Sequence, residues 1–454
     1  MRTGIRILSL VLGLLPVTFL QAAATKSPEK ADILPLSVAE KTLPNGLKVI
    51  VVPTGFPKLV SIQIPVQTGS RNEVEMGKTG FAHFFEHMMF RGTEKYPKDN
   101  YNNVLKSIGA DHNAFTDNDM TVYHILASSP SLETLMQLES DRFMNLKYSE
   151  EDFKTEAGAI LGEYNKSFSS PMEILFEKMQ DTAYVVHPYK HTTIGFLKDI
   201  MDMPNQFDYS RQFFDRWYRP ENTALIVVGD VKHEQVLTLA EKYYGGWKRG
   251  TYQGVIPPEP PQNQEKITHV SWKSETLPIL AIGYHGPAFS DTSYEMPAID
   301  LFSQLVFSQN SDLYRQLVIE EQLVEFLFGG EQDSRDPGLF LVLAKVKDPK
   351  NIERVRAMID AAIEEAKSKP ISAERLAGVK SHPKYSFAMG LDNPDAVARV
   401  LSNYYALTGD PDSVNRVYAI YDRITASQIQ EVANKYFKPA NRTVVILTKE
   451  GEPK

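Results

Sequence analysis

The chain has 454 residues, of which 42% are apolar and 23% charged, and its formal net charge is −8. This length favours two or more domains, and the apolar content argues against wholesale disorder. The acidic balance and the lack of a Lys/Arg cluster argue against nucleic acid as a partner, and the absence of cysteine excludes disulfides and thiolate metal sites. Any bound metal must therefore be held by His, Asp or Glu.

Residues 1–24 have the pattern of a cleaved secretory signal peptide. Two arginines precede an apolar run over residues 7–20, and three alanines end the segment. An uncleaved membrane anchor is the alternative, but the run is short and is interrupted by Pro16. Cleavage removes two arginines and no acidic residue, so the net charge of the mature chain would be −10. We expect an exported protein without membrane contact after leader cleavage, and the lack of an anchor and of disulfides favours a bacterial periplasm.

The segments after the leader are predicted to mix strands and helices. Stretches rich in β-branched residues are expected to form strands: LKVIVVP (47–53), after a turn at Asn45-Gly46, VSIQIPVQTG (60–69), and the hairpin NAFTDNDMTVYHILA (113–127), which turns at 117–119. Stretches with apolar residues at helical spacing are expected to form helices: 80–90 and 132–146. Interleaved helices and strands predict an α+β sandwich.

The first predicted helix contains the sequence HFFEH. His83 and His87 are four residues apart and therefore share one helical face, with Glu86 beside them. Two neutral imidazoles on one helical turn can hold zinc, and an adjacent carboxylate can accept a proton from water. Taken alone the motif is a weak signal, because short motifs recur by chance. A buried helix with two incidental histidines is the alternative.

A second helix is predicted over residues 148–168 and offers a further ligand. Ser149 and Asp152 have the spacing of a capping box at its start. Glu156 and Glu163 are seven residues apart and share one face. Two glutamates at this spacing are commonly a solvated stripe, but the apolar AGAIL sequence between them indicates a face near the core, where a carboxylate needs a cation.

The chain also repeats itself at an offset of 219 residues. The motifs YRPEN (218–222) and FKPAN (437–441) each follow an amphipathic helix and precede a β-rich run, which favours an internal duplication over a shared loop motif. The proline-rich segment VIPPEPPQNQEK (255–266) is expected to be an extended linker. The predicted fold is α+β, with two similar α/β sandwich halves: an N-terminal half over 25–254, with the candidate zinc motif HFFEH, and a C-terminal half over 267–454 without a metal site.

Further segments around these motifs match a known family. HFFEH, Glu156, Glu163 and the segments LPNGL, GSRNE, FRGT, NAFT and HPY together resemble the pitrilysin-type zinc peptidases, the family of insulin-degrading enzyme and mitochondrial processing peptidase. The resemblance extends from Thr42 to about Leu447 and includes the two-half layout. It implies a zinc metalloendopeptidase, with zinc as the cofactor and unfolded or extended peptides as substrates.

The resemblance also implies roles for individual residues. It makes Glu86 the general base and Glu156 a carboxylate that orients a metal ligand without binding the metal itself. The implied zinc ligands are His83, His87 and Glu163. Four residues match an edge strand on which substrates dock in extended form: Asn113, Ala114, Phe115 and Thr116. From the residues alone, a buried hairpin is the alternative for this segment.

The second half departs from the family pattern. Active single-chain members resemble one another in a segment L-Y-x-x-L-R-x6-Y, whose Arg and Tyr contact the substrate at the zinc. This chain matches it over Leu313 to Leu317 but has Val318 at the Arg position and Glu325 at the Tyr position. Losing such a donor typically lowers the rate on the order of a hundredfold.

This departure implies that the chain is the zinc-bearing member of a heterodimer, whose homologous partner supplies Arg and Tyr. A homodimer is an alternative if another residue, such as Arg315, supplies the missing charge. The other alternative is a non-catalytic assembly or binding subunit of a peptidase-like complex.

Overall fold

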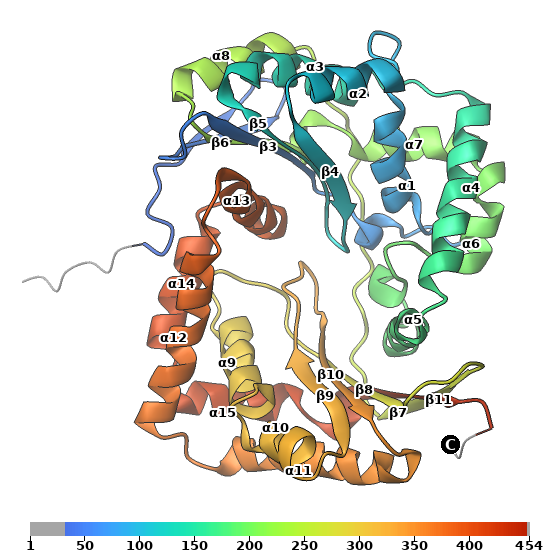
Figure 1. The fold of residues 1–454 in the computed structure, drawn as a ribbon, viewed down its shortest axis with the longest axis vertical. Helices are drawn as coiled ribbons and strands as arrows, with labels where there is room; N and C mark the ends of the chain where they lie inside the picture. The colour runs from blue at the N-terminus through green and yellow to red at the C-terminus, as the bar shows by residue number, and fades with distance from the viewer. Residues whose placement is uncertain (1–31, 452–454) are drawn as a thin grey trace, which may run out of the picture. The chain divides into compact units, whose positions relative to one another are not determined.

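The computed structural model describes residues 32–451, and the predicted signal peptide lies outside this range. From Ile33 onward the chain belongs to one compact unit, which contains two mixed sheets with helices packed on them (Figure 1). Within the described range, no helix combines the length and apolar character needed to cross a lipid bilayer.

The first sheet contains the strands predicted in the first half. Its spatial order is β1 (Ala39–Thr42), β2 (Lys48–Pro53), β6 (Ala224–Gly229), β3 (Leu59–Val66), β5 (Thr121–Ser128) and β4 (Asp111–Thr116). Strands β2 and β6 pair in parallel, and the other neighbours pair antiparallel. Strand β3 ends at Val66, before the predicted end at residue 69, because the chain turns there into a 3₁₀ helix over residues 70–72.

Both faces of the sheet are buried at strand β2, which explains its continuous apolar run. Val49 and Val51 belong to the core under the helices of the first half. Ile50 and Val52 point to the other face and pack in a separate cluster with α13 (Pro394–Thr408). Successive side chains of a strand alternate between faces, so a strand covered on both sides is apolar throughout.

The helices of the first half include those that the sequence predicts. They are α1 (Phe81–Met88), α2 (Lys98–Ser107), α3 (Leu132–Asn145), α4 (Glu150–Ser167), α5 (Pro171–Ala183), α6 (Leu197–Asp202), α7 (Phe207–Trp217) and α8 (His233–Tyr244). The predicted helix over residues 132–146 corresponds to α3, and the predicted helix over 80–90 corresponds to α1 followed by a 3₁₀ turn.

The second half repeats the first sheet. Its strands lie in the order β7 (Lys266–Trp272), β11 (Arg442–Lys449), β8 (Ile279–His285), β10 (Leu339–Val346) and β9 (Val324–Gly330). As in the series β2-β6-β3-β5-β4, the first pair is parallel and the others are antiparallel. The remaining helices are α9 (Glu295–Phe307), α10 (Asp312–Tyr314), the π-helix η7 (Arg315–Glu320), α11 (Ile352–Ser368), α12 (Ala373–Met389), α14 (Ser413–Arg423) and α15 (Ala426–Tyr436).

The duplicated motif forms the same turn in both halves. The side-chain amide of Asn222 donates to the carbonyl of Trp217 at 2.9 Å, and that of Asn441 donates to the carbonyl of Tyr436 at 2.8 Å. In each half the asparagine side chain thus caps the C-terminal end of the preceding helix, and a central strand follows. The predicted α+β fold with two similar halves is confirmed.

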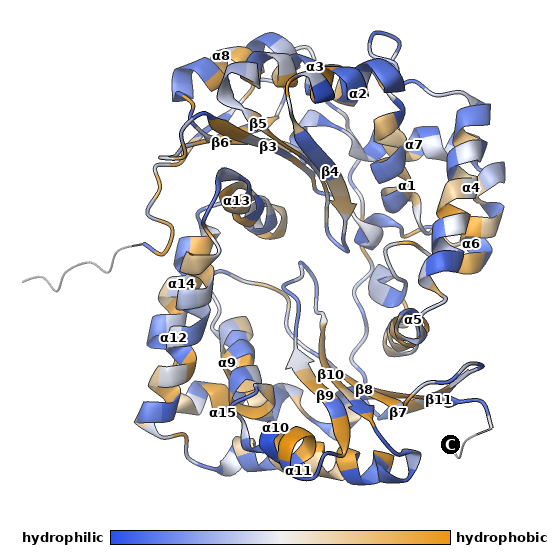
Figure 2. Ribbon diagram, in the orientation of Figure 1, coloured by the Kyte–Doolittle hydropathy of each residue, from blue (hydrophilic) through white to orange (hydrophobic). Residues whose placement is uncertain are grey.

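Each half contributes one helix to the sheet of the other half. Helix α13 covers the first sheet through Val397 and Leu401, and α5 covers the second sheet through Leu175 and Met179 (Figure 1). In Figure 2 the strands of both sheets are largely hydrophobic, whereas α12, which has no buried residue, is mostly hydrophilic. The halves therefore share buried surface.

The segment predicted as a linker runs along the first half. Glu259 accepts hydrogen bonds from the backbone N–H groups of Val185, Val186 and His187 at 2.7, 3.0 and 2.9 Å. Lys266, the last residue of the segment, already begins β7. The segment is thus hydrogen-bonded to the first half and is not a free linker. The domain boundaries remain a prediction.

A loop over residues 331–338 joins β9 to β10 and contacts the first half through Asp336. The carboxylate of Asp336 accepts a hydrogen bond from Arg71 Nε at 2.5 Å and lies 2.9 Å from His187 Nε2. Burial opposes ionisation of this carboxyl, but the hydrogen bonds from His187 and Arg71 outweigh it and lower the pKa of Asp336. The ionised carboxylate thereby joins the two halves.

We expect Asp336→Asn to lower the free energy of unfolding by about 2 kcal/mol at pH 7, because a partly buried charge pair is broken. The pKa of Asp336 is lower in the folded than in the unfolded chain. Its contribution is therefore present above its unfolded pKa, near 4, and is lost as the pH falls through the folded pKa. Urea unfolding at pH 7 and in acid measures both effects. Glu94→Gln, which breaks the exposed pair with Lys147, is the control and should change nothing measurable.

Candidate metal centre

Helix α1 presents the polar residues of HFFEH on one side because its other side is apolar. Phe81, Phe84, Phe85 and Met88 are all buried in the core of the first half. Since these positions recur every three or four residues, they occupy one face of the helix. The histidines and Glu86 are left on the opposite side, as the sequence predicts.

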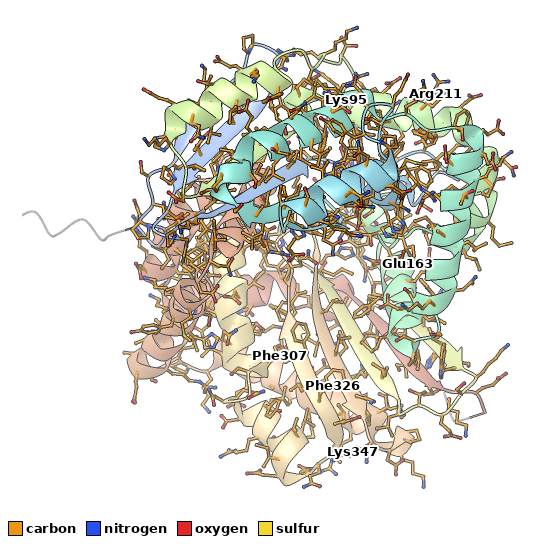
Figure 3. All side chains as sticks on the ribbon, turned by 45° about the horizontal axis from the view of Figure 1, so that its top comes forward. Lys95, Glu163, Arg211, Phe307, Phe326 and Lys347 are labelled. Carbon is orange, nitrogen blue, oxygen red and sulfur yellow. The ribbon has the colours of Figure 1, made fainter. Side chains whose placement is uncertain are left out.

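Helix α4 begins with the predicted capping box. Ser149 Oγ accepts from the backbone N–H of Asp152 at 3.0 Å, and the Asp152 carboxylate accepts from the backbone N–H of Ser149 at 2.9 Å. Ala157 and Ile160 are buried, so this face of the helix packs on the core. Figure 3 shows Glu163 on this helix, near its lower end.

The structure brings together the three residues that the resemblance makes zinc ligands. Glu163 lies 3.8 Å from His83 Nε2 and 3.3 Å from His87 Nε2. One ligand atom from each of the three residues lies within 4.8 Å of the others, and residues 32–451 contain no other such group of three. Two imidazoles and one carboxylate are a ligand set that fits tetrahedral zinc with one position open.

The two histidines are held differently. Burial, together with the nearby His87, lowers the pKa of His83 to about 3, so His83 is neutral as a ligand must be. Burial alone would lower the pKa of His87 as well, but the Glu156 hydrogen bond and charge raise it. His87 Nδ1 lies 3.0 Å from Glu156, so this nitrogen carries the proton and Nε2 faces Glu163.

Arg91 extends this chain of contacts. Its guanidinium donates to Glu156 Oε2 at 2.5 Å, while Oε1 of the same carboxylate faces His87. Although burial opposes ionisation, His87 and Arg91 lower the pKa of Glu156, which keeps it an acceptor. Glu156 therefore stands where the resemblance expects an orienting carboxylate, and Arg91 is a contact that the sequence reasoning missed.

Glu156→Gln is expected to weaken zinc binding by about 10- to 100-fold, because the carboxylate that orients His87 loses its charge. Competition with a chromophoric zinc chelator measures the change. The matched control is Glu150→Gln, on an exposed residue of the same helix that pairs with Lys154. Equal zinc affinity in wild type and Glu156→Gln would contradict the orienting role.

Glu86 lies between the cluster and the edge of the first sheet. Its carboxylate accepts a hydrogen bond from Thr116 Oγ1 at 2.8 Å, and burial raises its pKa above the usual value. Thr116 is the last residue of β4. A carboxyl with a raised pKa beside a ligand cluster is suited to proton transfer.

Strand β4 is the outermost strand of its sheet. It pairs with β5 on one side and ends the strand order on the other. Asn113 is exposed, Ala114 is buried, and Phe115 and Thr116 are half-buried. The predicted hairpin is present, and its exposed outer edge leads directly to Glu86 through Thr116.

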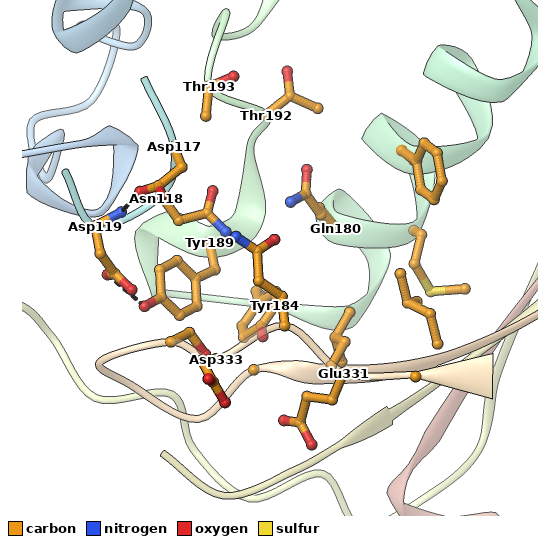
Figure 4. Close-up of a pocket in the computed structure, with 18 of the residues that line it drawn as sticks. Asp117, Asn118, Asp119, Gln180, Tyr184, Tyr189, Thr192, Thr193, Glu331 and Asp333 are labelled. Atoms are coloured by element: carbon orange, nitrogen blue, oxygen red, sulfur yellow. Dashed lines mark hydrogen bonds between the residues drawn. The ribbon is translucent and has the colours of Figure 1, made fainter. Parts of the chain in front are cut away.

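A cavity of about 510 Å³ continues from Thr116 (Figure 4). Four carboxylates line it: Asp117 and Asp119 from the β4–β5 turn, and Glu331 and Asp333 from the β9–β10 loop. Burial raises the pKa of Asp117 and of Asp333 to about 6. The hydrogen bond from Tyr189 to Asp119, at 2.7 Å, is visible in Figure 4. Sequence reasoning missed this cavity, because its walls come from segments far apart in the chain.

The two positions that depart from the family pattern lie in the second half. Val318 is in the π-helix η7 and packs partly against the core. Glu325 is on β9 and precedes Phe326, which is labelled in Figure 3. Its carboxylate is 2.7 Å from Lys345 Nζ. Arg315, named above as a substitute under the homodimer alternative, pairs with acidic neighbours of its own segment: Asp312 and Glu320.

Two family descriptions match the chain. "Insulinase (Peptidase family M16)" matches residues 48–195, and "Peptidase M16 inactive domain" matches residues 206–382. The zinc protease PqqE of Helicobacter pylori is 29% identical over 415 residues, which cover 89% of this chain and 91% of that protein. The mitochondrial-processing peptidase subunit beta of Neurospora crassa is 24% identical, covering 87% of this chain and 84% of that protein.

Solved structures agree with these matches. The crystal structure of a protease from Helicobacter pylori superposes with a TM-score of 0.85 at 29% identity, over 91% of this chain and 99% of that one. An M16-like peptidase from Alicyclobacillus acidocaldarius shares the fold, with a TM-score of 0.80 at 19% identity over 92% and 99% of the two chains. The zinc proteases among the relatives identify zinc as the metal cofactor. The chain belongs to peptidase family M16, the pitrilysin-type family expected from its sequence.

Proposed function

We propose that the chain is the catalytic subunit of a zinc metalloendopeptidase that hydrolyses unfolded or extended peptides, with a homologous partner that supplies Arg and Tyr. The observation that carries this proposal is the placement of Glu86. Its carboxylate lies beside the cluster of His83, His87 and Glu163 and is hydrogen-bonded to the end of an edge strand.

The chemistry follows from these side chains. Zinc, when bound by the two histidines and Glu163, polarises the scissile carbonyl and lowers the pKa of water. Glu86 accepts the proton of the attacking water on its carboxylate and delivers it to the leaving amine. Its raised pKa favours the first of these steps, because a more basic carboxylate takes up the proton more readily. No covalent bond to the protein is needed.

The edge strand supports the proposed substrate class. An extended peptide can add to the outer edge of β4 by backbone hydrogen bonds. Such bonds select for an extended backbone more than for a particular sequence. Because Thr116 ends this strand and binds Glu86, a peptide paired along Asn113–Thr116 would pass the base. The cavity beyond Thr116 offers room for its continuation.

The proposed partner rests on the second half. Valine at position 318 offers no side-chain donor, and Glu325 is an acceptor already paired with Lys345. Arg315 does not favour a homodimer, since its guanidinium pairs with Asp312 and Glu320. A non-catalytic subunit is disfavoured by the complete set of ligands, base and orienting carboxylate.

We further propose a periplasmic location, on the basis of the predicted signal peptide.

Hydrolysis of an internally quenched unfolded peptide tests the proposal. The zinc-loaded mature chain alone should turn over about a hundredfold more slowly than the chain mixed with a homologous subunit that carries the family Arg and Tyr. A full rate without a partner would overturn the heterodimer. No hydrolysis with any Arg/Tyr-bearing homologue, in a chain that holds zinc, would favour the non-catalytic alternative.

A further inference from the structure

The start of helix α1 lacks a capping side chain of its own. Its N-cap residue is Gly80, with φ +92°, and a Cβ at this position would lie 2.6 Å from the carbonyl oxygen of Ile194. Only glycine fits there. An N-cap residue normally accepts a hydrogen bond from one of the free N–H groups of the first turn, and glycine has no side chain for this.

Glu73 takes the place of the missing cap from outside the helix. Its Oε2 accepts from the backbone N–H of Gly80 at 2.6 Å, and its Oε1 accepts from that of Ala82 at 2.7 Å. The side chain is fully buried. A carboxylate at this end of a helix is also favoured by the helix dipole. The carboxyl thus fixes the first turn of α1 to the GSRNE segment.

The first turn matters because it carries His83, which follows Ala82 directly. Metal-binding histidines are usually oriented through their second ring nitrogen. His87 is oriented in this way by Glu156, but His83 Nδ1 is buried and has no hydrogen-bond partner among the described residues. The position of the His83 ring therefore depends on the backbone beneath it.

We propose that Glu73 is a positioning residue for the metal centre, which holds His83 in place through the backbone of α1. The inference rests on the proposed ligand set. Two titratable groups face Glu73. His191 Nε2 is 3.8 Å from its carboxyl group, and the negative charge of Asp199 raises the pKa of Glu73. Burial raises the pKa of Glu73 to about 8, and the hydrogen bonds from Ala82 and Gly80 oppose this rise.

Glu73→Gln tests the proposal, because an amide oxygen can accept one of the two N–H groups but its NH₂ faces the other. We expect zinc affinity, measured against a chelator, to fall by about 10- to 100-fold. We also expect the visible absorption spectrum of the Co²⁺-substituted chain to change, because the ligand geometry changes. The matched control is Thr425→Ala, which removes the N-cap of α15, a helix without metal ligands. It should lower stability and leave both metal readouts unchanged.

The outcomes separate the inference from the ligand set on which it depends. If the folded Glu73→Gln chain binds zinc as tightly as wild type and its Co²⁺ spectrum is unchanged, the inference is overturned. If the wild-type chain binds neither metal, the ligand set itself is wrong, and the inference falls with it. Should Glu73→Gln fail to fold, Glu73→Asp decides. Aspartate keeps the carboxyl group but its shorter side chain draws the two oxygens back, so weaker zinc binding supports the inference and wild-type binding overturns it.

Discussion

Glu86→Gln should lower the rate of peptide hydrolysis by about 10²- to 10⁴-fold, the usual contribution of a general base. Glutamine keeps the shape of the side chain and can still accept the hydrogen bond from Thr116 Oγ1, which is 2.8 Å long in the wild type. It cannot take up the proton of the attacking water. The loss should therefore appear in the chemical step and not in the binding of metal or peptide.

Two controls isolate this effect. Zinc content should be the same in Glu86→Gln and wild type, because Glu86 is not one of the three clustered ligands. Thr116→Val removes the hydrogen-bond donor and leaves the carboxylate in place, so its effect should be smaller than that of Glu86→Gln. A Gln variant that hydrolyses the peptide at the wild-type rate, with the required partner present, would rule out Glu86 as the base.

Glu163→Gln is expected to weaken zinc binding by at least about 100-fold, or about 3 kcal/mol, because one of three protein ligands loses its charge. Hydrolysis at limiting zinc should fall with the metal content. Equilibrium dialysis followed by elemental analysis measures the bound zinc.

The control for this change lies on the same helix. Glu151→Gln alters an exposed carboxylate in the first turn of α4 and should leave zinc binding unchanged. If Glu163→Gln retains stoichiometric zinc at wild-type affinity, the third ligand has been assigned wrongly.

Local signals in the sequence were sufficient to predict the two helices that carry the site. The apolar spacing in α1 and the capping box of α4 are properties of short segments, and both are present as predicted. Spacing also placed His83 and His87 on one face. The meeting of Glu163 with these histidines depends on how two helices pack, and it was expected only through the family resemblance.

Contacts between distant segments were not predictable in the same way. Glu73 belongs to the GSRNE segment of the family resemblance, but nothing in the sequence shows that the backbone of α1 donates hydrogen bonds to its carboxyl group. The cavity beyond Thr116 takes two of its carboxylates from the β9–β10 loop, which lies more than 200 residues further along the chain. The exchange of α5 and α13 between the sheets likewise has no local signal, because an amphipathic helix does not specify which sheet it covers.

Anomalous diffraction at the zinc absorption edge, from crystals of the zinc-loaded mature chain, locates the metal and so tests whether the proposed ligands bind it. We expect one strong peak per chain, between His83 Nε2, His87 Nε2 and the carboxylate of Glu163, with Glu86 close by and not bound to the metal. A chain saturated with zinc that shows no peak at this position, or a peak held by other residues, would contradict it.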